Sequence, residues 1–333
     1  MKTKLKIAAA GVLLILSATN YAAAQTTLLN VSYDVAREFY KDYNAAFIAH
    51  YKKTTGKDIK VDQAHGGSSA QARAVNDGLE ADVVTMNTTT DIDFLASTGV
   101  VAKDWAKRFP GNASPTSSTM LFLTRNGNPK NIKDWDDLIK PDIKVIVVNP
   151  KTGGNGRMAY LAAWGYVRKK GGTDAQAAEF VAKLYKNVPV LAKGGRDATT
   201  IFLQRNIGDV LVTFESEVVS VDREFGAGKV DAIHPSISIV AENPVAIVER
   251  TVAKKGTAVL AKAYLDYLYS DEAQEIAAQH ALRPRSVAIL KKYANTFKPL
   301  QLFSVNEYFG SLAEAQKVHF NDGGQFDKLY TVK

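Results

Sequence analysis

Three glycine-rich stretches and one acidic residue stand where the chain could bind an anion. The longest stretch, residues 149–157, contains three glycines; the other two span residues 64–69 and 193–200, and Asp34 follows an apolar run. A tight turn from strand into helix leaves the first backbone N–H groups of the helix unpaired, at the positive end of its dipole. Such groups bind anions without any charged side chain. The alternative is that the glycines only supply turn conformations with positive φ.

The elements around these turns alternate between strand and helix. Residues 145–148 (Val-Ile-Val-Val) form an apolar β-branched run, which predicts a buried strand. Residues 158–164 have helix-forming composition. Asp34 stands between the strand-like run 27–33 and a helical pattern over 35–55, where an N-cap belongs.

The same alternation extends along most of the chain. Strands are expected at 27–33, 59–61, 81–86, 119–124, 145–148, 188–191, 209–214, 238–241 and 244–248. Helices are expected at 35–55, 70–79, 91–95, 135–139, 158–164, 175–185, 257–269, 271–280 and 315–320. This order predicts an α/β protein of two lobes, joined by chain crossings near residues 117 and 240. Turns at the carboxyl ends of such strands line the ligand crevice, and in two lobes they can face one another across a cleft.

The first residues indicate export. Lys2, Lys4 and Lys6 precede an apolar run over 7–16 and an Ala-Ala-Ala sequence that ends at Ala24. This pattern is typical of a secretory signal peptide, cleaved after Ala24. The apolar run is too short for a membrane anchor.

Composition narrows the setting further. The chain has no cysteine, which excludes disulfides and a lipid-anchored cysteine, so an exported protein without a tether favours the periplasm. The net charge of +8, less the three lysines of the signal peptide, leaves +5. Basic and acidic residues are interspersed, with no run that suggests nucleic-acid binding. A modest positive field favours an anionic ligand.

Enzyme motifs are missing. The sequence has no G-x-x-x-x-G-K-[ST] phosphate loop, no G-x-S-x-G nucleophile elbow and no H-E-x-x-H zinc motif. The five histidines are scattered along the chain, and a single histidine beside a glycine turn, such as His65, is more often a hydrogen-bonding support than a catalyst. We therefore expect a binding protein with no catalytic residue, metal or cofactor.

Seven segments then resemble one family, in order along the chain. Residues 30–34 (NVSYD), 65–68 (HGGS), 81–85 (ADVVT), 149–152 (NPKT), 160–165 (YLAAWG), 208–211 (GDVL) and 264–270 (YLDYLYS) are similar to the periplasmic sulfate/thiosulfate-binding proteins of ABC transporters. The resemblance implies a type II periplasmic binding protein, each lobe a mainly parallel sheet flanked by helices with the ligand in the cleft. The implied division is 1–24 signal peptide, 25–117 plus 240–299 first lobe, and 118–239 plus 300–333 second lobe.

The resemblance also implies which residues hold a dehydrated oxyanion. The expected ligand-binding residues, through backbone N–H groups and the Ser68 hydroxyl, are Asp34, Ser68, Gly153, Gly154, Asn155, Gly195 and Phe214. The expected supporting residues are His65, Thr152, Arg157 and Arg196. A solvated surface position is the alternative for the two arginines. The implied partners are sulfate or thiosulfate and an inner-membrane permease, and we expect a monomer.

Two positions depart from the sulfate-binding pattern. Sulfate-binding members carry serine at the position of Gly153 and tryptophan at that of Phe214, so this chain lacks both side-chain donors. A hydrogen bond to a charged group is worth roughly 1.5–3 kcal/mol, so either sulfate is held more weakly or the ligand differs. The Thr152 hydroxyl could replace the serine after a small shift. Residues 213–217 and 194–196 look more like the thiosulfate-binding branch, and sulfur is a poorer acceptor than oxygen.

Other tetrahedral anions are the alternatives. Hydrogen phosphate carries a proton and requires an acceptor, which a donor-only site lacks, and such a mismatch can discriminate by about 10⁴. Asp34 is the only acid at a predicted turn, and an N-cap carboxylate should turn back onto its own helix. Molybdate is a larger dianion that sequence cannot distinguish from sulfate. A periplasmic phosphate-handling enzyme is the remaining alternative.

Overall fold

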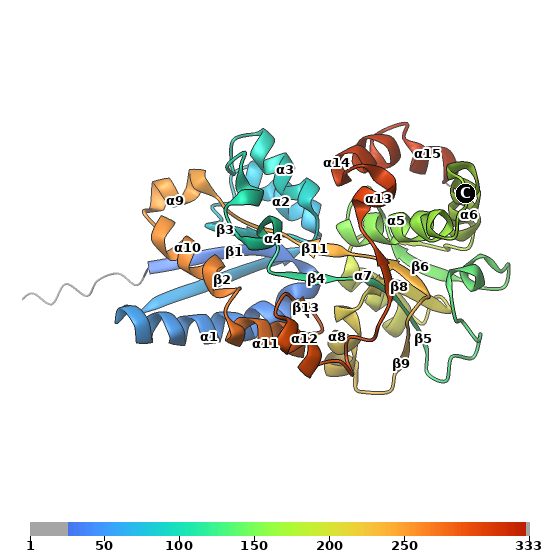
Figure 1. The fold of residues 1–333 in the computed structure, drawn as a ribbon, viewed down its shortest axis with the longest axis horizontal. Helices are drawn as coiled ribbons and strands as arrows, with labels where there is room; N and C mark the ends of the chain where they lie inside the picture. Colours follow the sequence, from blue (N-terminus) through green and yellow to red (C-terminus); the bar gives the residue numbers. More distant parts are fainter. Residues whose placement is uncertain (1–25, 331–333) are drawn as a thin grey trace, which may run out of the picture.

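The computed structural model describes residues 26–330, and the chain forms two lobes side by side (Figure 1). The signal peptide predicted for residues 1–24 lies outside the described residues. Within residues 26–330, no helix is both long enough and apolar enough to cross a membrane.

The first lobe is built on a four-stranded sheet in the order β12-β3-β1-β2. β1 (Thr26–Tyr33) pairs in parallel with β2 (Ile59–Gly66) and β3 (Val83–Thr85), and β12 (Val245–Ile247) is antiparallel to β3. The helical segments of this lobe are η1 (Asp34–Ala36), α1 (Arg37–Thr55), α2 (Ser68–Asn76), α3 (Thr89–Ser97), η2 (Trp105–Lys107), α4 (Pro110–Ala113), α9 (Glu249–Lys255), α10 (Ala258–Tyr267) and α11 (Asp271–Gln279).

The second lobe is built on a five-stranded sheet in the order β7-β6-β8-β5-β9. Its strands are β5 (Met120–Arg125), β6 (Val145–Val148), β7 (Leu191–Ala192), β8 (Val210–Phe214) and β9 (Val230–Ile233). β6 is parallel to β7 and β8, whereas β5 is antiparallel to β8 and β9. The helical segments are η3 (Trp135–Ile139), α5 (Gly154–Lys169), α6 (Asp174–Lys186), α7 (Gly195–Thr199), η4 (Thr200–Gln204) and α8 (Ser216–Phe225).

Short strands join the lobes. β4 (Thr116–Ser118) pairs antiparallel with β11 (Ala241–Asn243) and with β13 (Arg283–Pro284), and β4 and β11 run between the two lobes (Figure 1). β10 (Ile237–Ile239) pairs in parallel with β14 (Gln301–Phe303). The chain ends in α12 (Val287–Lys292), α13 (Val305–Phe309), α14 (Leu312–Ala315), η5 (Gln316–Phe320) and α15 (Gln325–Leu329).

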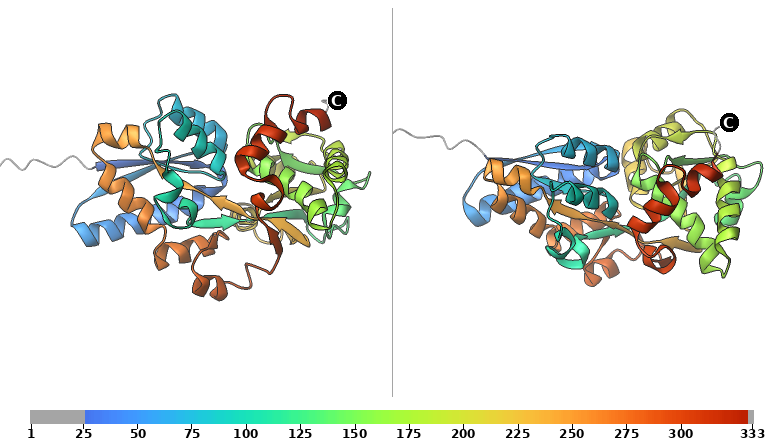
Figure 2. Two further views of the ribbon diagram at one scale, coloured as in Figure 1. Left: turned by 45° about the horizontal axis from the view of Figure 1, so that its top comes forward. Right: turned by 90° about the horizontal axis from the view of Figure 1, so that it is seen from above.

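Each lobe has its own buried core. One apolar cluster joins residues of β1, β3 and α1 with residues of α10 and α11, which return late in the sequence. Another joins β5, β6, α5 and α6 with apolar residues of the C-terminal helices, including Phe309, Phe320 and Phe326. Figure 2 shows the same separation from two further directions, with the last helices against the second lobe. The exact lobe boundaries given above stay a prediction.

The α/β class and the two-lobed architecture are confirmed, with sheets that are mixed rather than uniformly parallel. The predicted helix over 158–164 begins earlier, at Gly154, so its first turn lies inside the glycine stretch. α2 likewise begins at Ser68 rather than at residue 70. The strand expected over 188–191 is reduced to Leu191–Ala192, since Pro189 has no backbone N–H for a ladder. α8 was not predicted.

Candidate anion site

The four predicted turns meet at one place between the lobes. A Cβ atom added to Gly67 would lie 3.6 Å from the carbonyl oxygen of Thr152 and 3.8 Å from that of Lys193. A Cβ atom added to Gly194 would lie 2.9 Å from Asp34 Oδ2. Turns far apart in the sequence, two from each lobe, therefore lie within a few ångströms of one another, as expected for turns that face each other across a cleft.

Close approach, not positive φ, explains the glycines. Gly153 has φ −144° and Gly194 has φ −165°, which any residue adopts. A Cβ atom added to Gly154 would lie 2.2 Å from Asn87 Oδ1, and one added to Gly156 would lie 2.3 Å from the carbonyl oxygen of Val148. Side chains at these two positions would push the turns apart.

Three helices, α2, α5 and α7, begin at these turns. The backbone N–H groups at the start of each helix have no partner within that helix. The first bonds run from Gln71 N to Gly67 O in α2, from Arg157 N to Gly153 O in α5, and from Ala198 N to Gly194 O in α7. The N–H groups of Ser68, Gly154, Asn155 and Gly195 all come before those bonds. The N–H of Gly153 donates to the carbonyl oxygen of Asn149 at 3.1 Å and closes the turn.

Asp34 links the lobes. Its Oδ1 accepts the N–H of Val35 at 3.0 Å, and its Oδ2 accepts the N–H of Arg196, from the other lobe, at 3.1 Å. Burial raises the pKa of Asp34, and the two N–H groups oppose that shift because they stabilise the carboxylate. The predicted N-cap role of Asp34 is wrong, because Asp34 is the first residue of η1, whose N-cap is Tyr33, and α1 begins only at Arg37. Its carboxylate accepts the N–H of the next residue and also reaches α7.

The Ser68 hydroxyl is already engaged. It donates to Asp91 Oδ2 at 2.6 Å, and the N–H of Asn87 lies 3.4 Å from its oxygen. Asp91 also accepts the hydroxyls of Ser69 at 2.8 Å and Thr88 at 2.9 Å. A hydroxyl has one proton to donate, so a direct bond from Ser68 Oγ to an anion stays a prediction that requires the hydroxyl to turn.

Arg157 is buried and its side chain reaches the first lobe. Its guanidinium donates to the hydroxyls of Ser69 and of Thr90, the latter at 2.9 Å, and lies 3.5 Å from Asp91 Oδ1. Its Nε donates to the carbonyl oxygen of Pro150 in its own turn at 3.2 Å. The residue is 6 % exposed, so the solvated alternative does not apply to it.

Arg196 occupies a more open position. Its guanidinium pairs with Glu224 and lies 3.6 Å from Glu217 Oε1, and its side chain is 29 % exposed. Glu217 is fully buried and accepts the Thr199 hydroxyl at 2.7 Å. Burial raises the pKa of Glu217 to about 7, with Asp34 adding to the shift and Thr199 and Arg196 opposing it.

Two other predicted residues, His65 and Thr152, bond backbone carbonyl groups at or next to the turns. His65 Nδ1 bonds the carbonyl oxygen of Tyr33, next to Asp34, at 2.9 Å, and burial lowers the pKa of His65. The Thr152 hydroxyl lies 3.2 Å from the carbonyl oxygens of Asn149 and Lys193, so it is bound to backbone in this arrangement. Phe214 ends β8 and is 2 % exposed.

A serine at position 153 would meet an obstacle in this chain. A Cβ atom on Gly153 would lie 2.9 Å from Val148 Cγ1, and Val148 is fully buried. Such a contact requires the valine to shift. Val148 therefore occupies part of the space that a serine side chain at position 153 would need.

The sequence analysis missed a polar run that follows β3. Asn87, Thr88, Thr90 and Asp91 lie opposite α5 and hold Arg157 and the Ser68 turn. Their place directly after a buried strand, at the same sheet edge as the glycine turns, was the available signal. Glu217 was also missed, because α8 itself was not predicted.

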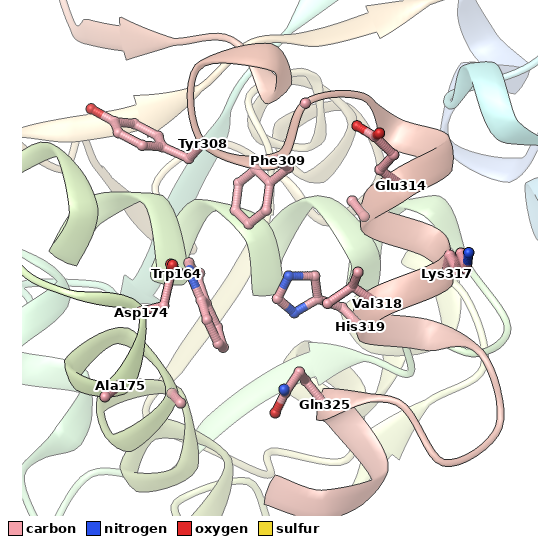
Figure 3. A pocket seen from close by; sticks show the side chains of 13 residues that line it. Trp164, Asp174, Ala175, Tyr308, Phe309, Glu314, Lys317, Val318, His319 and Gln325 are labelled. Carbon is pink, nitrogen blue, oxygen red and sulfur yellow. Dashed lines mark hydrogen bonds between the residues drawn. The ribbon is translucent and has the colours of Figure 1, made fainter.

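A separate cavity lies in the second lobe. It has a volume of about 860 Å³ and is lined by Trp164, Tyr308, Phe309 and His319, beneath the C-terminal helices (Figure 3). None of the predicted site residues lines it. Burial lowers the pKa of His319 to about 4. Among residues 26–330, no group of three or more His, Cys, Asp or Glu side chains could hold a metal ion.

Known proteins similar to this chain include anion-binding proteins. The family described as bacterial extracellular solute-binding protein matches residues 31–283. A thiosulfate-binding protein of Pseudomonas aeruginosa is 55 % identical over 311 residues, which cover 93 % of this chain and 94 % of that protein. A sulfate-binding protein of Escherichia coli is 49 % identical over 320 residues, covering 96 % of this chain and 97 % of that protein.

A solved structure agrees. The sulfate-binding protein SubI from Mycobacterium tuberculosis superposes with a TM-score of 0.82 at 30 % identity, covering 89 % of this chain and all of that one. The chain therefore belongs to the bacterial extracellular solute-binding proteins, and within them to the sulfate- and thiosulfate-binding proteins.

Proposed function

We propose that this protein is the periplasmic substrate-binding component of a sulfate/thiosulfate ABC importer. The observation that carries the proposal is the meeting of four backbone turns from two lobes, in a chain 55 % identical to a thiosulfate-binding protein. The protein performs no catalysis in this role. After export, the signal peptide is removed by cleavage after Ala24. The mature protein, a monomer, then binds the anion and delivers it to the membrane permease.

The proposed donors are backbone N–H groups of both lobes. The first lobe offers those of Asp34 and Ser68, and the second offers those of Gly154, Asn155 and Gly195. Gly153 shapes the turn and uses its own N–H there. A buried dianion without a counter-charge is costly, and fixed N–H dipoles at helix starts offset that cost.

The lining favours thiosulfate as a good ligand. Phe214 presents a buried aromatic ring where sulfate-binding members have an indole donor, and Gly153 presents no hydroxyl. Neither departure is compensated by Thr152, whose hydroxyl is bound to backbone. A terminal sulfur, larger than oxygen and a weaker acceptor, loses less than a sulfate oxygen from the absence of those two donors.

Hydrogen phosphate is a poorer fit to the same groups. Both Asp34 oxygens already accept backbone N–H groups, so this carboxylate is not free to accept a proton from a ligand. Two buried amide oxygens, Asn87 Oδ1 and Asn155 Oδ1, have no hydrogen-bond partner among the described residues. They are the acceptors through which phosphate would bind if it competed well.

Closure completes the site. Arg157 bonds Ser69 and Thr90, and Asp34 bonds the N–H of Arg196, so donors from both lobes are held together only when the lobes are in contact. The strands β4 and β11 between the lobes can act as the hinge. The permease would then distinguish this closed form from an open one.

Calorimetric titration of the purified mature protein with sulfate and thiosulfate tests the proposal. We expect both to bind, and molybdate and phosphate to compete less well than either. No binding of sulfate or thiosulfate would refute the function. Strong competition by phosphate would instead refute the donor-only description of the site, and strong competition by molybdate would reassign the ligand.

A further inference from the structure

Glu217 is a buried acid that the proposed binding mechanism does not use. It lies in the first turn of α8, where it is fully buried, and its Oε1 accepts the Thr199 hydroxyl at 2.7 Å. Its Oε2 is buried with no hydrogen-bond partner among the described residues. A buried carboxylate oxygen without a donor is costly when it carries charge.

The surroundings of Glu217 are rich in acid. Three carboxylates lie next to Arg196. Glu217 Oε1 lies 3.6 Å from its guanidinium and Glu224 pairs with that guanidinium, whereas Asp34 accepts the backbone N–H of Arg196 and lies close enough to act on Glu217. Asp34 comes from η1 of the other lobe, which packs against α8. The contact that closes the lobes thus brings two carboxylates together.

We propose that Glu217 carries a proton in the closed, anion-loaded protein, so that capture of the dianion is coupled to uptake of one proton at this carboxyl. The inference rests on the proposed function, because it needs a dianion at the α7 turn. Three ionised carboxylates and a dianion next to Arg196 would leave a large excess of negative charge. One proton on Glu217 removes part of that excess without moving any helix.

Glu217, rather than Asp34, is the acid that takes the proton. Both Asp34 oxygens accept backbone N–H groups, which stabilise its ionised form. Among residues 26–330, Glu217 accepts a hydrogen bond from the Thr199 hydroxyl alone. Glu224 is 42 % exposed and in direct contact with Arg196, so it lacks the burial of Glu217. Burial already raises the pKa of Glu217 to about 7, and a nearby dianion raises it further.

The sign of the effect follows. Below the pKa of the free protein, Glu217 already holds its proton and no uptake occurs on binding. Between the pKa of the free protein and the higher pKa of the loaded protein, binding takes up a proton. Affinity should therefore fall as the pH rises above about 7, by at most tenfold per pH unit for one proton. Sulfate and thiosulfate carry no proton in this range, so the protein supplies the titrating group.

Calorimetry in buffers of different ionisation enthalpy measures the proton directly. Sulfate and thiosulfate are titrated into wild-type protein, Glu217→Gln and Glu224→Gln at about pH 5.5 and about pH 7.5. Glutamine matches the shape of the protonated acid and can still accept the Thr199 hydroxyl. We expect wild type and Glu224→Gln to take up a fraction of one proton at the higher pH and none at the lower pH, and Glu217→Gln to take up none at either.

The outcomes separate the two proposals. If neither anion binds to wild type, both the function and the coupling are refuted. If the anions bind with the same heat in every buffer at about pH 7.5, the function stands and the coupling is refuted. If Glu217→Gln still takes up a proton whereas Asp34→Asn does not, the proton belongs to Asp34 and the assignment is wrong. If Glu217→Gln does not fold, the wild-type buffer dependence still decides whether a proton is taken up.

Discussion

The two sides of the anion site treat charge differently. On one side, Arg157 is 7 % exposed at its side chain and is matched by one carboxylate, Asp91, which itself accepts three hydroxyls. On the other side, the Arg196 side chain is 29 % exposed and is faced by the carboxylates of Glu217 and Glu224, and Asp34 accepts its backbone N–H. On the first side both oxygens of Asp91 accept hydrogen bonds, whereas on the second Glu217 Oε2 has no partner among the described residues.

This difference separates two tasks within one site. The buried guanidinium of Arg157 and the fully bonded carboxylate of Asp91 fix the geometry of the Ser68 and Gly153 turns. A side with excess carboxylate responds to pH and to the arrival of a dianion. Variants on the Arg157 side should therefore change affinity at every pH, whereas variants on the Arg196 side should change the pH profile.

Ser68→Leu should give the largest effect, because it breaks the Arg157 side at its centre. The substitution removes the hydroxyl that donates to Asp91 and forces a larger side chain into a position that is 1 % exposed. The lost bond to a charged group and the overpacking together cost roughly 3–6 kcal/mol. We expect calorimetry to show an affinity loss of more than about 100-fold.

A matched control for this variant is Lys254→Leu, at a lysine side chain that is 71 % exposed and remote from the turns. It should bind as wild type does. Thermal melting of both variants shows whether the fold is intact. Normal binding by a folded Ser68→Leu protein would mean that the anion site lies elsewhere.

On the Arg196 side, Glu217→Gln should raise stability at high pH without ligand. The pKa of Glu217 is raised from 4.5 to about 7, so the folded state holds a proton that the unfolded state has released. Stability should therefore fall as the pH rises from about 4.5 to about 7, by about 3 kcal/mol in total. Denaturant unfolding should show that fall in wild type and its absence in Glu217→Gln. Parallel profiles in the two proteins would contradict the assignment.

The turns themselves could be predicted from the sequence. Gly67, Gly153 and Gly194 mark helix starts in short-range patterns of strand, glycine and helix, and the structure brings all three together between the lobes. Local composition is sufficient for this, since a helix start exposes its N–H groups whatever the rest of the fold does.

The partners of the side chains could not be predicted. The Ser68 hydroxyl donates to Asp91, and Arg157 reaches Thr90, which is 67 residues away. Glu217 faces Asp34 from the other lobe. These contacts depend on how the two lobes meet, which no local pattern encodes. The Ser68 hydroxyl has one proton, and because it donates that proton to Asp91 it cannot at the same time donate to an anion. Such a conflict can be recognised only when the partner of each side chain is known.

Replacement of Arg157 or Arg196 by methionine should have the smallest effect on affinity, and the two variants allow the two sides of the site to be compared directly. Arg157→Met removes donors to Ser69, Thr90 and Pro150 O and leaves Asp91 with its three hydroxyls. Because those hydroxyls remain, the variant should lose about 1–3 kcal/mol of binding free energy, which is less than the cost of leaving a buried carboxylate without any donor. Affinity should fall by roughly tenfold to 100-fold, equally at about pH 5.5 and about pH 7.5.

Arg196→Met is the matched control, of the same size and on the other side of the same site. It leaves Glu217 to take a proton more readily, because the guanidinium no longer stabilises the carboxylate. Its loss relative to wild type should be less than about tenfold at pH 5.5 and smaller still at pH 7.5, where Glu217 of the variant already holds its proton before the anion binds. A pH-dependent loss in Arg157→Met with a pH-independent loss in Arg196→Met would reverse the roles of the two sides, because the pH response would then belong to the turns that Arg157 holds and not to Glu217.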